Sequence, residues 1–188
     1  MLILASQSPR RRELLGRLGL PFTAVSADID ETMTPGIDPV LEVARLSREK
    51  ARAVVAGPRD VVLAADTVVI LDGEVLGKPH TPEKAREMLG RLSGRAHLVV
   101  TGYTVLKDGK AVTETEESRI FFRDLLPREI EAYVESGEPL DKAGAYGIQG
   151  LGALFIRGLE GDYYNVMGLP LCALTQTLRS LGLPVLGV

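Results

Sequence analysis

The sequence contains one cysteine and two histidines in 188 residues. The single cysteine, Cys172, cannot form a disulfide within the chain, which indicates a reducing compartment. Its position in the apolar run 169–174 predicts that the thiol packs inside the protein. Such low counts also exclude a zinc site built from thiolates or several histidines. Any metal ion would therefore be held by oxygen ligands.

Long apolar runs and an excess of positive charge are also missing. No run reaches the length that spans a bilayer, and arginines follow the first apolar residues too soon for a signal peptide. The 22 basic and 25 acidic residues give a formal net charge of −3, which does not favour contact with a nucleic-acid backbone. We therefore expect a cytoplasmic protein that contacts neither membranes nor nucleic acids.

Helices and strands alternate in the hydrophobic pattern of a chain that is 45% hydrophobic and 25% charged. Apolar runs bounded by turn residues predict strands at 2–5, 22–26, 61–65, 68–71, 74–76, 97–106, 111–122 and 153–156. Spaced apolar residues behind capping residues predict helices at 9–18, 39–55, 82–92, 127–136 and 169–181. Because hairpins interrupt the alternation, we predict the α/β class with a mixed, elongated sheet and flanking helices. No long linker or repeat divides the chain, so residues 1–188 should form one domain with two lobes.

A helix start rich in arginine is the first candidate site. Ser8 suits an N-cap and Pro9 suits the first helical turn, and Arg10 and Arg11 follow at once. Free backbone N–H groups at a helix start attract anions, and a guanidinium binds phosphate through two parallel hydrogen bonds. The segment fits a phosphate site and a capped helix with solvated arginines equally well.

Asp66 is the strongest anomaly in the sequence. It interrupts an apolar run that continues on both sides, and a buried carboxylate without a partner is unfavourable. Such a group caps a segment, binds a metal or performs chemistry, and we favour a functional role. The hairpin expected at Asp72–Gly73 could return Lys78 to the neighbourhood of Asp66, where a cation would stabilise phosphate charge.

An acidic loop follows the expected strand 22–26. Its carboxylates, which belong to Asp28, Asp30 and Glu31, could hold Mg²⁺ or Mn²⁺ through oxygen ligands. The segment also matches the Asp-x-Asp-x-Thr pattern of haloacid-dehalogenase-type phosphatases, in which the first Asp, here Asp28, is the nucleophile. The strand before it is only half apolar, which weakens that match. A solvated surface cluster is the third interpretation.

The segment 144–152 is rich in glycine, which lets a backbone approach a ligand closely. Within it, Gln149 carries an amide that can pair with the edge of uracil or thymine. No Gly-Lys-Ser/Thr sequence follows the glycines, so the segment is not a Walker motif. His80 and His97 share no spacing with a nucleophilic Ser or Cys, and we interpret them as surface or structural residues.

Taken in order along the chain, these segments resemble the Maf family, the septum-formation-inhibitor-like nucleotide pyrophosphatases. The resemblance runs from Ala5–Arg11 to Asn165–Pro170 and includes Ala64–Val69 and the glycine-rich segment. It implies an inosine-triphosphatase-like α/β fold with a cleft between two lobes, often as a homodimer. It also implies hydrolysis of a nucleoside triphosphate to the monophosphate and pyrophosphate with a divalent cation, Mg²⁺ or Mn²⁺.

The resemblance also implies roles for particular residues. Asp66 would be the general base, and Glu31 would join Asp66 at the metal. The phosphates would be bound by Ser8, Arg10, Arg11, Lys50 and Lys78.

Substrate choice within the family is implied by the segment Tyr146–Gly150, which resembles the Tyr-x-Ile-Gln-Gly of the branch acting on dTTP and UTP. The sister branch, acting on 7-methyl-GTP, has a glutamate where Gln149 stands, and a carboxylate suits the donors of a purine. Arg11, Thr67 and Gln149 are thus the expected specificity positions. The implied task is cleaning nucleotide pools, with a link to division arrest. Two alternatives stay open: a phosphatase that uses Asp28, and a non-catalytic nucleotide-binding regulator of cell division.

Overall fold

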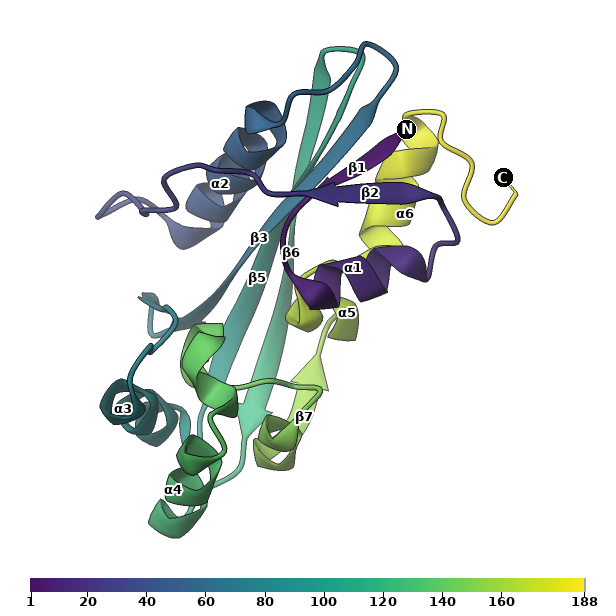
Figure 1. The fold of residues 1–188 in the computed structure, drawn as a ribbon. Helices are drawn as coiled ribbons and strands as arrows, with labels where there is room; N and C mark the ends of the chain where they lie inside the picture. The colour runs from purple at the N-terminus through teal and green to yellow at the C-terminus, as the bar shows by residue number, and fades with distance from the viewer. Residues whose placement is uncertain (188) are drawn as a thin grey trace. The chain divides into compact units, whose positions relative to one another are not determined.

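The structure is a computed structural model that describes residues 1–187 (Figure 1). Within these residues a seven-stranded mixed sheet has the hydrogen-bonded order β2-β1-β3-β5-β6-β7, and β4 pairs with β3. The strands are β1 (Leu2–Ala5), β2 (Phe22–Val25), β3 (Val61–Leu71), β4 (Glu74–Leu76), β5 (Ala96–Lys107), β6 (Lys110–Phe122) and β7 (Ile156–Glu160). The α-helices are α1 (Pro9–Gly16), α2 (Pro39–Ala53), α3 (Pro82–Leu92), α4 (Pro127–Glu135), α5 (Tyr163–Met167) and α6 (Leu171–Ser180). The predicted α/β class with a mixed sheet is confirmed.

The chain forms two compact units, each with its own helices and part of the sheet. Unit 1 comprises Met1–Asp66, Thr101–Glu116 and the chain from Gly168 to the end of the described residues. Unit 2 comprises Thr67–Val100 and Glu117–Met167. No helix in the described part of the chain is both long and apolar enough to cross a bilayer.

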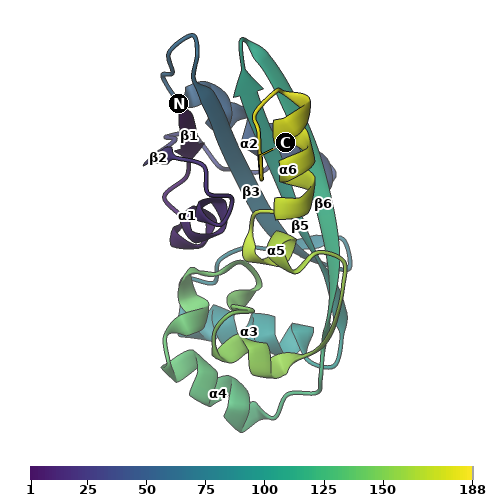
Figure 2. The same ribbon diagram turned by 90° about the vertical axis from the view of Figure 1, so that its right-hand side faces the viewer.

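In unit 1 the buried strand β1 lies between β2 and β3 and is parallel to both. Helices α2 and α6 cover opposite faces of this sheet (Figure 2). Because successive side chains of a strand point to opposite faces, neighbouring residues of β5 contact different helices. Thr104 Oγ1 lies 2.8 Å from Ser47 Oγ of α2. The hydroxyl of Tyr103 lies 2.9 Å from Thr177 Oγ1 of α6.

Gly102 lets α2 approach β5 closely. A Cβ atom at this position would lie 2.6 Å from both the carbonyl carbon and the carbonyl oxygen of Val43, which belong to the α2 backbone. Atoms at that separation overlap, so any other residue would push the helix away from the sheet. Helix α2 carries Lys50, so Gly102 helps to fix the position of that side chain.

In unit 2 a tight hairpin joins β3 to β4, as the sequence predicts. Asp72 has φ 53° and Gly73 has φ 80°, the left-handed conformations that a two-residue type I′ turn requires. Helix α3 then begins behind Thr81, whose Oγ1 accepts a hydrogen bond of 3.3 Å from the backbone N–H of Lys84. Both local predictions are confirmed.

His97 lies in the aromatic core of unit 2 and is 3% exposed. Its Nε2 is 2.8 Å from the hydroxyl of Tyr146, and its ring packs edge-on against the rings of Phe122 and Tyr146. Burial lowers the pKa of His97 to about 4. These contacts are those of a structural residue, whereas His80 is exposed.

Several predicted boundaries are wrong. β3 is one continuous strand through Asp66 and Thr67, because a polar side chain does not remove the backbone groups that pair with neighbouring strands. The expected strand at 153–156 is wrong because Leu151–Phe155 forms a 3₁₀-helix and β7 begins at Ile156. Periodicity cannot separate short apolar strands from short helices. Helix α5 was not predicted.

The expectation that Cys172 packs inside the protein is also wrong, because Cys172 is exposed. It lies on α6, whose buried side chains include Leu171, Leu174 and Leu178. Their spacing of three and four residues defines one face of the helix, and position 172 turns away from it. An apolar run alone does not reveal which helix face is covered.

The buried His97 predicts a pH dependence of stability. Its pKa is about 4 in the folded state against the ordinary 6.5, so the unfolded state binds more protons between these values. The free energy of unfolding should therefore fall by about 3 kcal/mol as the pH is lowered from about 6.5 to about 4. Urea unfolding at several pH values across this range would measure the free energy of unfolding of the wild type and of His97→Gln. The glutamine keeps a hydrogen-bonding group near Tyr146.

The variant should lose this part of the pH dependence. His80→Gln, which changes an exposed histidine, is the matched control and should keep it. Parallel profiles for the wild type and His97→Gln would contradict the assignment of the pH dependence to His97.

Candidate functional site

A buried ammonium brings three predicted site residues together in unit 1. Lys50 of α2 is 6% exposed, and its Nζ lies 2.6 Å from Oδ1 of Asp66 and 3.0 Å from Oε1 of Glu31. The three residues come from a helix, a strand and the loop between β2 and α2. Since a buried charge needs a charged or hydrogen-bonding partner, Lys50 holds these segments to one another.

The docking of α2 on β5 fixes where Lys50 lies. Ser47 stands three residues before Lys50 and is fully buried, and its hydroxyl contacts Thr104 Oγ1. Thr104 Oγ1 in turn lies 2.9 Å from Thr113 Oγ1 of β6. This chain of hydroxyl groups ties one turn of α2 to two strands of unit 1.

The start of α1 forms as the sequence predicts and lies in the same electrostatic environment. Ser8 is the N-cap, and its Oγ accepts a hydrogen bond of 3.4 Å from the backbone N–H of Arg11. The Nε of Arg11 donates a hydrogen bond of 2.8 Å to the carbonyl oxygen of Gly168. Burial lowers the pKa of Arg11, Asp66 opposes that shift, and the neighbouring Arg10 lowers the pKa further. Arg10 is half-buried.

Two further charged residues of α2 hold the loop that carries Glu31. The buried carboxylate of Glu42 accepts hydrogen bonds of 2.6 Å from the backbone N–H of Thr34 and 2.9 Å from Nε of Arg45. The Nη2 of Arg45 also donates to the carbonyl oxygen of Thr32 at 3.1 Å. The loop is thereby bonded to α2 directly beside Glu31.

Glu42 and Arg45 were not predicted from the sequence. Their only signal is a pair of opposite charges three residues apart on a helix, and such pairs are common on exposed surfaces. In the structure, the hydrogen bonds from Arg45 and from the Thr34 N–H lower the pKa of Glu42 to about 2. This carboxylate is therefore ionised at neutral pH.

The remaining predicted site residues lie in unit 2. Thr67 is half-buried, and Lys78 and Gln149 are exposed. The backbone N–H of Gly144 donates a hydrogen bond of 3.1 Å to the carbonyl oxygen of Gly77. The glycine-rich segment is therefore bonded to the residue that directly precedes Lys78.

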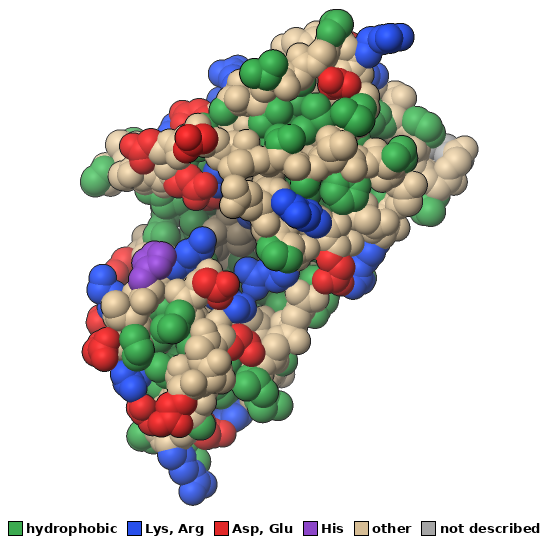
Figure 3. All heavy atoms as spheres, viewed as in Figure 1, with side chains coloured by type: hydrophobic (Ala, Val, Ile, Leu, Met, Phe, Trp, Pro, Cys, Tyr) green, Lys and Arg blue, Asp and Glu red, His purple; other side chains and the backbone are tan. Residues whose placement is uncertain are grey.

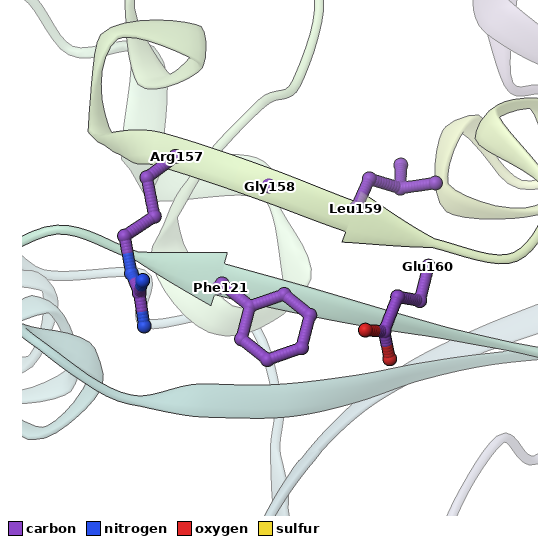
Figure 4. Close-up of a pocket in the computed structure, with 5 residues that line it drawn as sticks. All are labelled: Phe121, Arg157, Gly158, Leu159 and Glu160. Carbon is purple, nitrogen blue, oxygen red and sulfur yellow. The ribbon is translucent and has the colours of Figure 1, made fainter.

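A hollow of about 320 Å³ in unit 2 lies apart from every predicted site residue. It is lined by Phe121, Arg157, Gly158, Leu159 and Glu160 of β6 and β7 (Figure 4). The guanidinium carbon of Arg157 is 5.7 Å from the centre of the Phe121 ring, a cation–π contact. Because none of the predicted site residues lines this hollow, it is not part of the candidate site.

Asp28 has a different setting from Asp66. It is exposed and follows β2, a partly exposed strand at the edge of the sheet. The phosphatase pattern instead needs a buried strand that delivers its first Asp. Acidic and basic side chains are interspersed over the face of the molecule drawn in Figure 3, so an exposed carboxylate is ordinary on this protein.

The oxygen donors of Asp66 and Glu31 fit a divalent cation that is shared with a phosphate ligand. Within residues 1–187 no group of three or more His, Cys, Asp or Glu residues could hold a metal ion alone. Mg²⁺ is usually bound by one or two carboxylates together with substrate phosphates. Two carboxylates that share one cationic group, Nζ of Lys50, suit that mode of binding.

Comparison with known proteins gives matches over almost the whole chain. The family model described as "Maf-like protein" matches residues 1–181. The chain is 53% identical to the dTTP/UTP pyrophosphatase of Moorella thermoacetica over 189 residues, which cover 99% of this chain and 97% of that protein. It is 50% identical to the dTTP/UTP pyrophosphatase of Symbiobacterium thermophilum over 185 residues, which cover 98% and 95%.

Among solved structures, a HAM1 protein from Coxiella burnetii resembles this chain with a TM-score of 0.52 and 16% sequence identity. The match covers 95% of this chain and 98% of that one. At this identity the likeness shows a shared fold.

The contacts of Arg45 predict that it protects the loop between β2 and α2 from proteolysis. Arg45→Met removes the hydrogen bonds to Glu42 and Thr32, so the loop should open more often and be cleaved about tenfold faster by a protease specific for acidic residues. Mass spectrometry would locate the cuts after Asp28, Asp30 or Glu31.

Arg52→Met is the matched control, because it changes an exposed arginine in the last turn of the same helix. Its cleavage rate should equal that of the wild type. Circular dichroism would establish that both variants are folded. An unchanged cleavage rate in folded Arg45→Met would contradict the role given to Arg45.

Proposed function

The chain belongs to the family of Maf-like proteins, and from this premise we propose that it hydrolyses dTTP and UTP to the nucleoside monophosphate and pyrophosphate. Relatives that bear the name dTTP/UTP pyrophosphatase match nearly its whole length. The structural observation that carries the proposal is the cluster of Asp66, Lys50 and Glu31, in which two carboxylates share one buried ammonium.

In this reaction Asp66 is the general base. Its carboxylate takes a proton from a water molecule while the water oxygen bonds to the α-phosphorus. The bond from the α-phosphorus to the oxygen that bridges to the β-phosphorus then breaks, and pyrophosphate leaves. The Asp66 side chain is 13% exposed, so water can reach a carboxylate that is otherwise enclosed, as a general base requires.

The phosphates are bound by cationic and N–H groups of the chain. In unit 1, Ser8, Arg10 and Arg11 stand at the start of α1, where backbone N–H groups and guanidinium groups attract anions. The ammonium of Lys50 has three donors, so it can contact a phosphate oxygen beside its carboxylate partners. Lys78 of unit 2 would add a further positive charge. Together these groups stabilise the negative charge that develops as pyrophosphate leaves.

Asp66 and Glu31 would hold a divalent cation, Mg²⁺ or Mn²⁺, together with the phosphates. When bound, the cation supplies positive charge that neutralises the phosphate oxygens. Two observations support this role. Carboxylate oxygens are the ligands that such a cation prefers, and among the described residues there are too few of them in one place to bind an ion without phosphate oxygens of the substrate.

Gln149 recognises the pyrimidine base in this proposal. Its amide offers one acceptor and two donors, which complement the carbonyl and imide edge that uracil and thymine share. A purine with ring N–H and amino donors suits a carboxylate instead. Arg11 and Thr67 are the other proposed specificity positions.

In the cell, the enzyme would remove dTTP, UTP or related pyrimidine nucleotides from the nucleotide pool, with a link to division arrest.

We propose that residues 1–188 form a single domain whose two lobes surround a cleft and that the protein acts as a cytoplasmic homodimer. The single cysteine supports a reducing compartment, and the net charge of −3 argues against a nucleic-acid partner.

Replacement of Asp66 tests the proposed base. Asp66→Asn removes the proton acceptor with little change in shape, so kcat for dTTP and UTP should fall by about 10²–10⁴-fold. Chromatography of the products formed with Mg²⁺ or Mn²⁺ should show monophosphate and pyrophosphate from the wild type. Asp28→Asn is the matched control, because it makes the same change at an exposed carboxylate, and it should keep wild-type turnover.

Near-wild-type turnover in Asp66→Asn would contradict the role of Asp66. Orthophosphate as the product, lost in Asp28→Asn, would support the phosphatase alternative. Nucleotide binding without turnover in the wild type would support a regulator that is not an enzyme.

A further inference from the structure

The glycine-rich loop of unit 2 is folded around a carboxylate of the protein itself. Oε2 of Glu138 accepts a hydrogen bond of 2.9 Å from the backbone N–H of Leu151. Oε1 accepts hydrogen bonds of 3.2 Å from the N–H of Gly152 and 2.9 Å from the hydroxyl of Tyr133. The Tyr133 oxygen in turn accepts a hydrogen bond of 3.1 Å from the N–H of Gly147. One carboxylate and one hydroxyl thus hold three backbone amides of the loop.

The glycines of this loop make room for these internal groups. A Cβ atom on Gly150 would overlap the Glu138 carboxylate. A Cβ on Gly152 would lie 2.9 Å from the Tyr133 oxygen and 2.8 Å from the carbonyl oxygen of Gly147. The glycines were predicted to allow close approach of a ligand, whereas at these positions the close approach is made by groups of the protein itself.

Glu138 is a charged anchor. Burial raises the pKa of Glu138, but the hydrogen bonds from the Leu151 N–H, the Tyr133 hydroxyl and the Gly152 N–H, together with the positive charge of Lys142, outweigh burial and lower the pKa. The carboxylate is therefore ionised at neutral pH. Hydrogen bonds to an ionised acceptor are stronger than those between neutral groups, so the charge of Glu138 contributes directly to the order of the loop.

Gln149 lies between the anchored amides. Gly147 precedes it by two residues and Leu151 follows it by two, and both are bonded to the anchor. A hydrogen bond of 3.3 Å from the N–H of Gly150 to the carbonyl oxygen of Gly147 closes the turn around it. Gln149 itself is exposed. The backbone on both sides of Gln149 is therefore held by hydrogen bonds, while Gln149 itself remains exposed to solvent.

We infer that Glu138 is a positioning residue for nucleobase selectivity, which holds the loop of Gln149 in the conformation that receives a pyrimidine. The inference rests on the proposed function, because that function assigns base recognition to Gln149. A loop that is ordered before the substrate arrives does not lose conformational entropy on binding. Glu138 contributes this order without touching the base, and Tyr133 extends the anchor to Gly147.

Residue-resolved hydrogen exchange tests the anchor without any substrate. In Glu138→Gln an amide NH₂ replaces one carboxylate oxygen and faces backbone donors, so the N–H groups of Leu151 and Gly152 should exchange at least about tenfold faster. Glu135→Gln is the matched control, because it makes the same change at an exposed residue at the end of α4. It should leave exchange in the loop unchanged.

Steady-state kinetics tests the consequence for selectivity. In Glu138→Gln, KM for dTTP and UTP should rise about tenfold, because the loop must be ordered on binding. The value of kcat should stay within about threefold of the wild type, since Glu138 contacts no reacting atom and the bound state is unchanged. The Gln149 amide complements the base of dTTP but not the ring N–H and amino donors of 7-methyl-GTP, so the preference for dTTP over 7-methyl-GTP should fall.

Faster exchange with an unchanged preference for dTTP over 7-methyl-GTP would overturn the role in selectivity. Unchanged exchange would overturn the anchor. If Glu138→Gln does not fold, Tyr133→Phe provides the test, because it removes only the hydroxyl and should release chiefly the N–H of Gly147. A wild type that hydrolyses neither dTTP nor UTP would overturn the proposed function and the selectivity role with it. The exchange data would still decide whether Glu138 anchors the loop.

Discussion

The buried ammonium of Lys50 is the interaction on which the candidate site depends. A charge that is 6% exposed must be compensated within the protein, and its partners Asp66 and Glu31 come from a strand and a loop. The ammonium reaches both only because Gly102 lets α2 lie close to the sheet and Arg45 holds the loop against α2. The geometry of the site is therefore a result of packing throughout unit 1 and not of any one motif.

The parts of the fold that were predictable from the sequence depend on a few neighbouring residues. The Asp72–Gly73 hairpin and the caps at Ser8 and Thr81 are of this kind, and each forms as expected. The mixed sheet followed from such local signals. Features that depend on distant neighbours were missed. The exposure of Cys172 depends on which face of α6 the sheet covers, and β3 continues through Asp66 as part of a sheet formed with strands that are distant in the sequence.

The candidate site also contains residues that the sequence predicts and residues that only the fold reveals. The segments that resemble the Maf family pointed to Asp66 and Lys50, which the structure brings into contact. Glu42 and Glu138 are ordinary acidic residues in the sequence, and their importance arises from the backbone N–H groups that the fold brings to them. Both act in the same physical manner. An ionised side chain satisfies backbone donors that have no partner in a helix or strand, and so gives a loop a defined conformation.

The central claim is that water attacks the α-phosphorus of dTTP or UTP and that pyrophosphate leaves intact. Hydrolysis in water enriched in ¹⁸O tests this claim most directly, because the oxygen of the attacking water stays on the phosphorus that it attacks. Mass spectrometry of the products should find the label in the nucleoside monophosphate and none in pyrophosphate. Label in pyrophosphate would mean attack on the β-phosphorus, and label in orthophosphate would mean a phosphatase; either result would contradict the account.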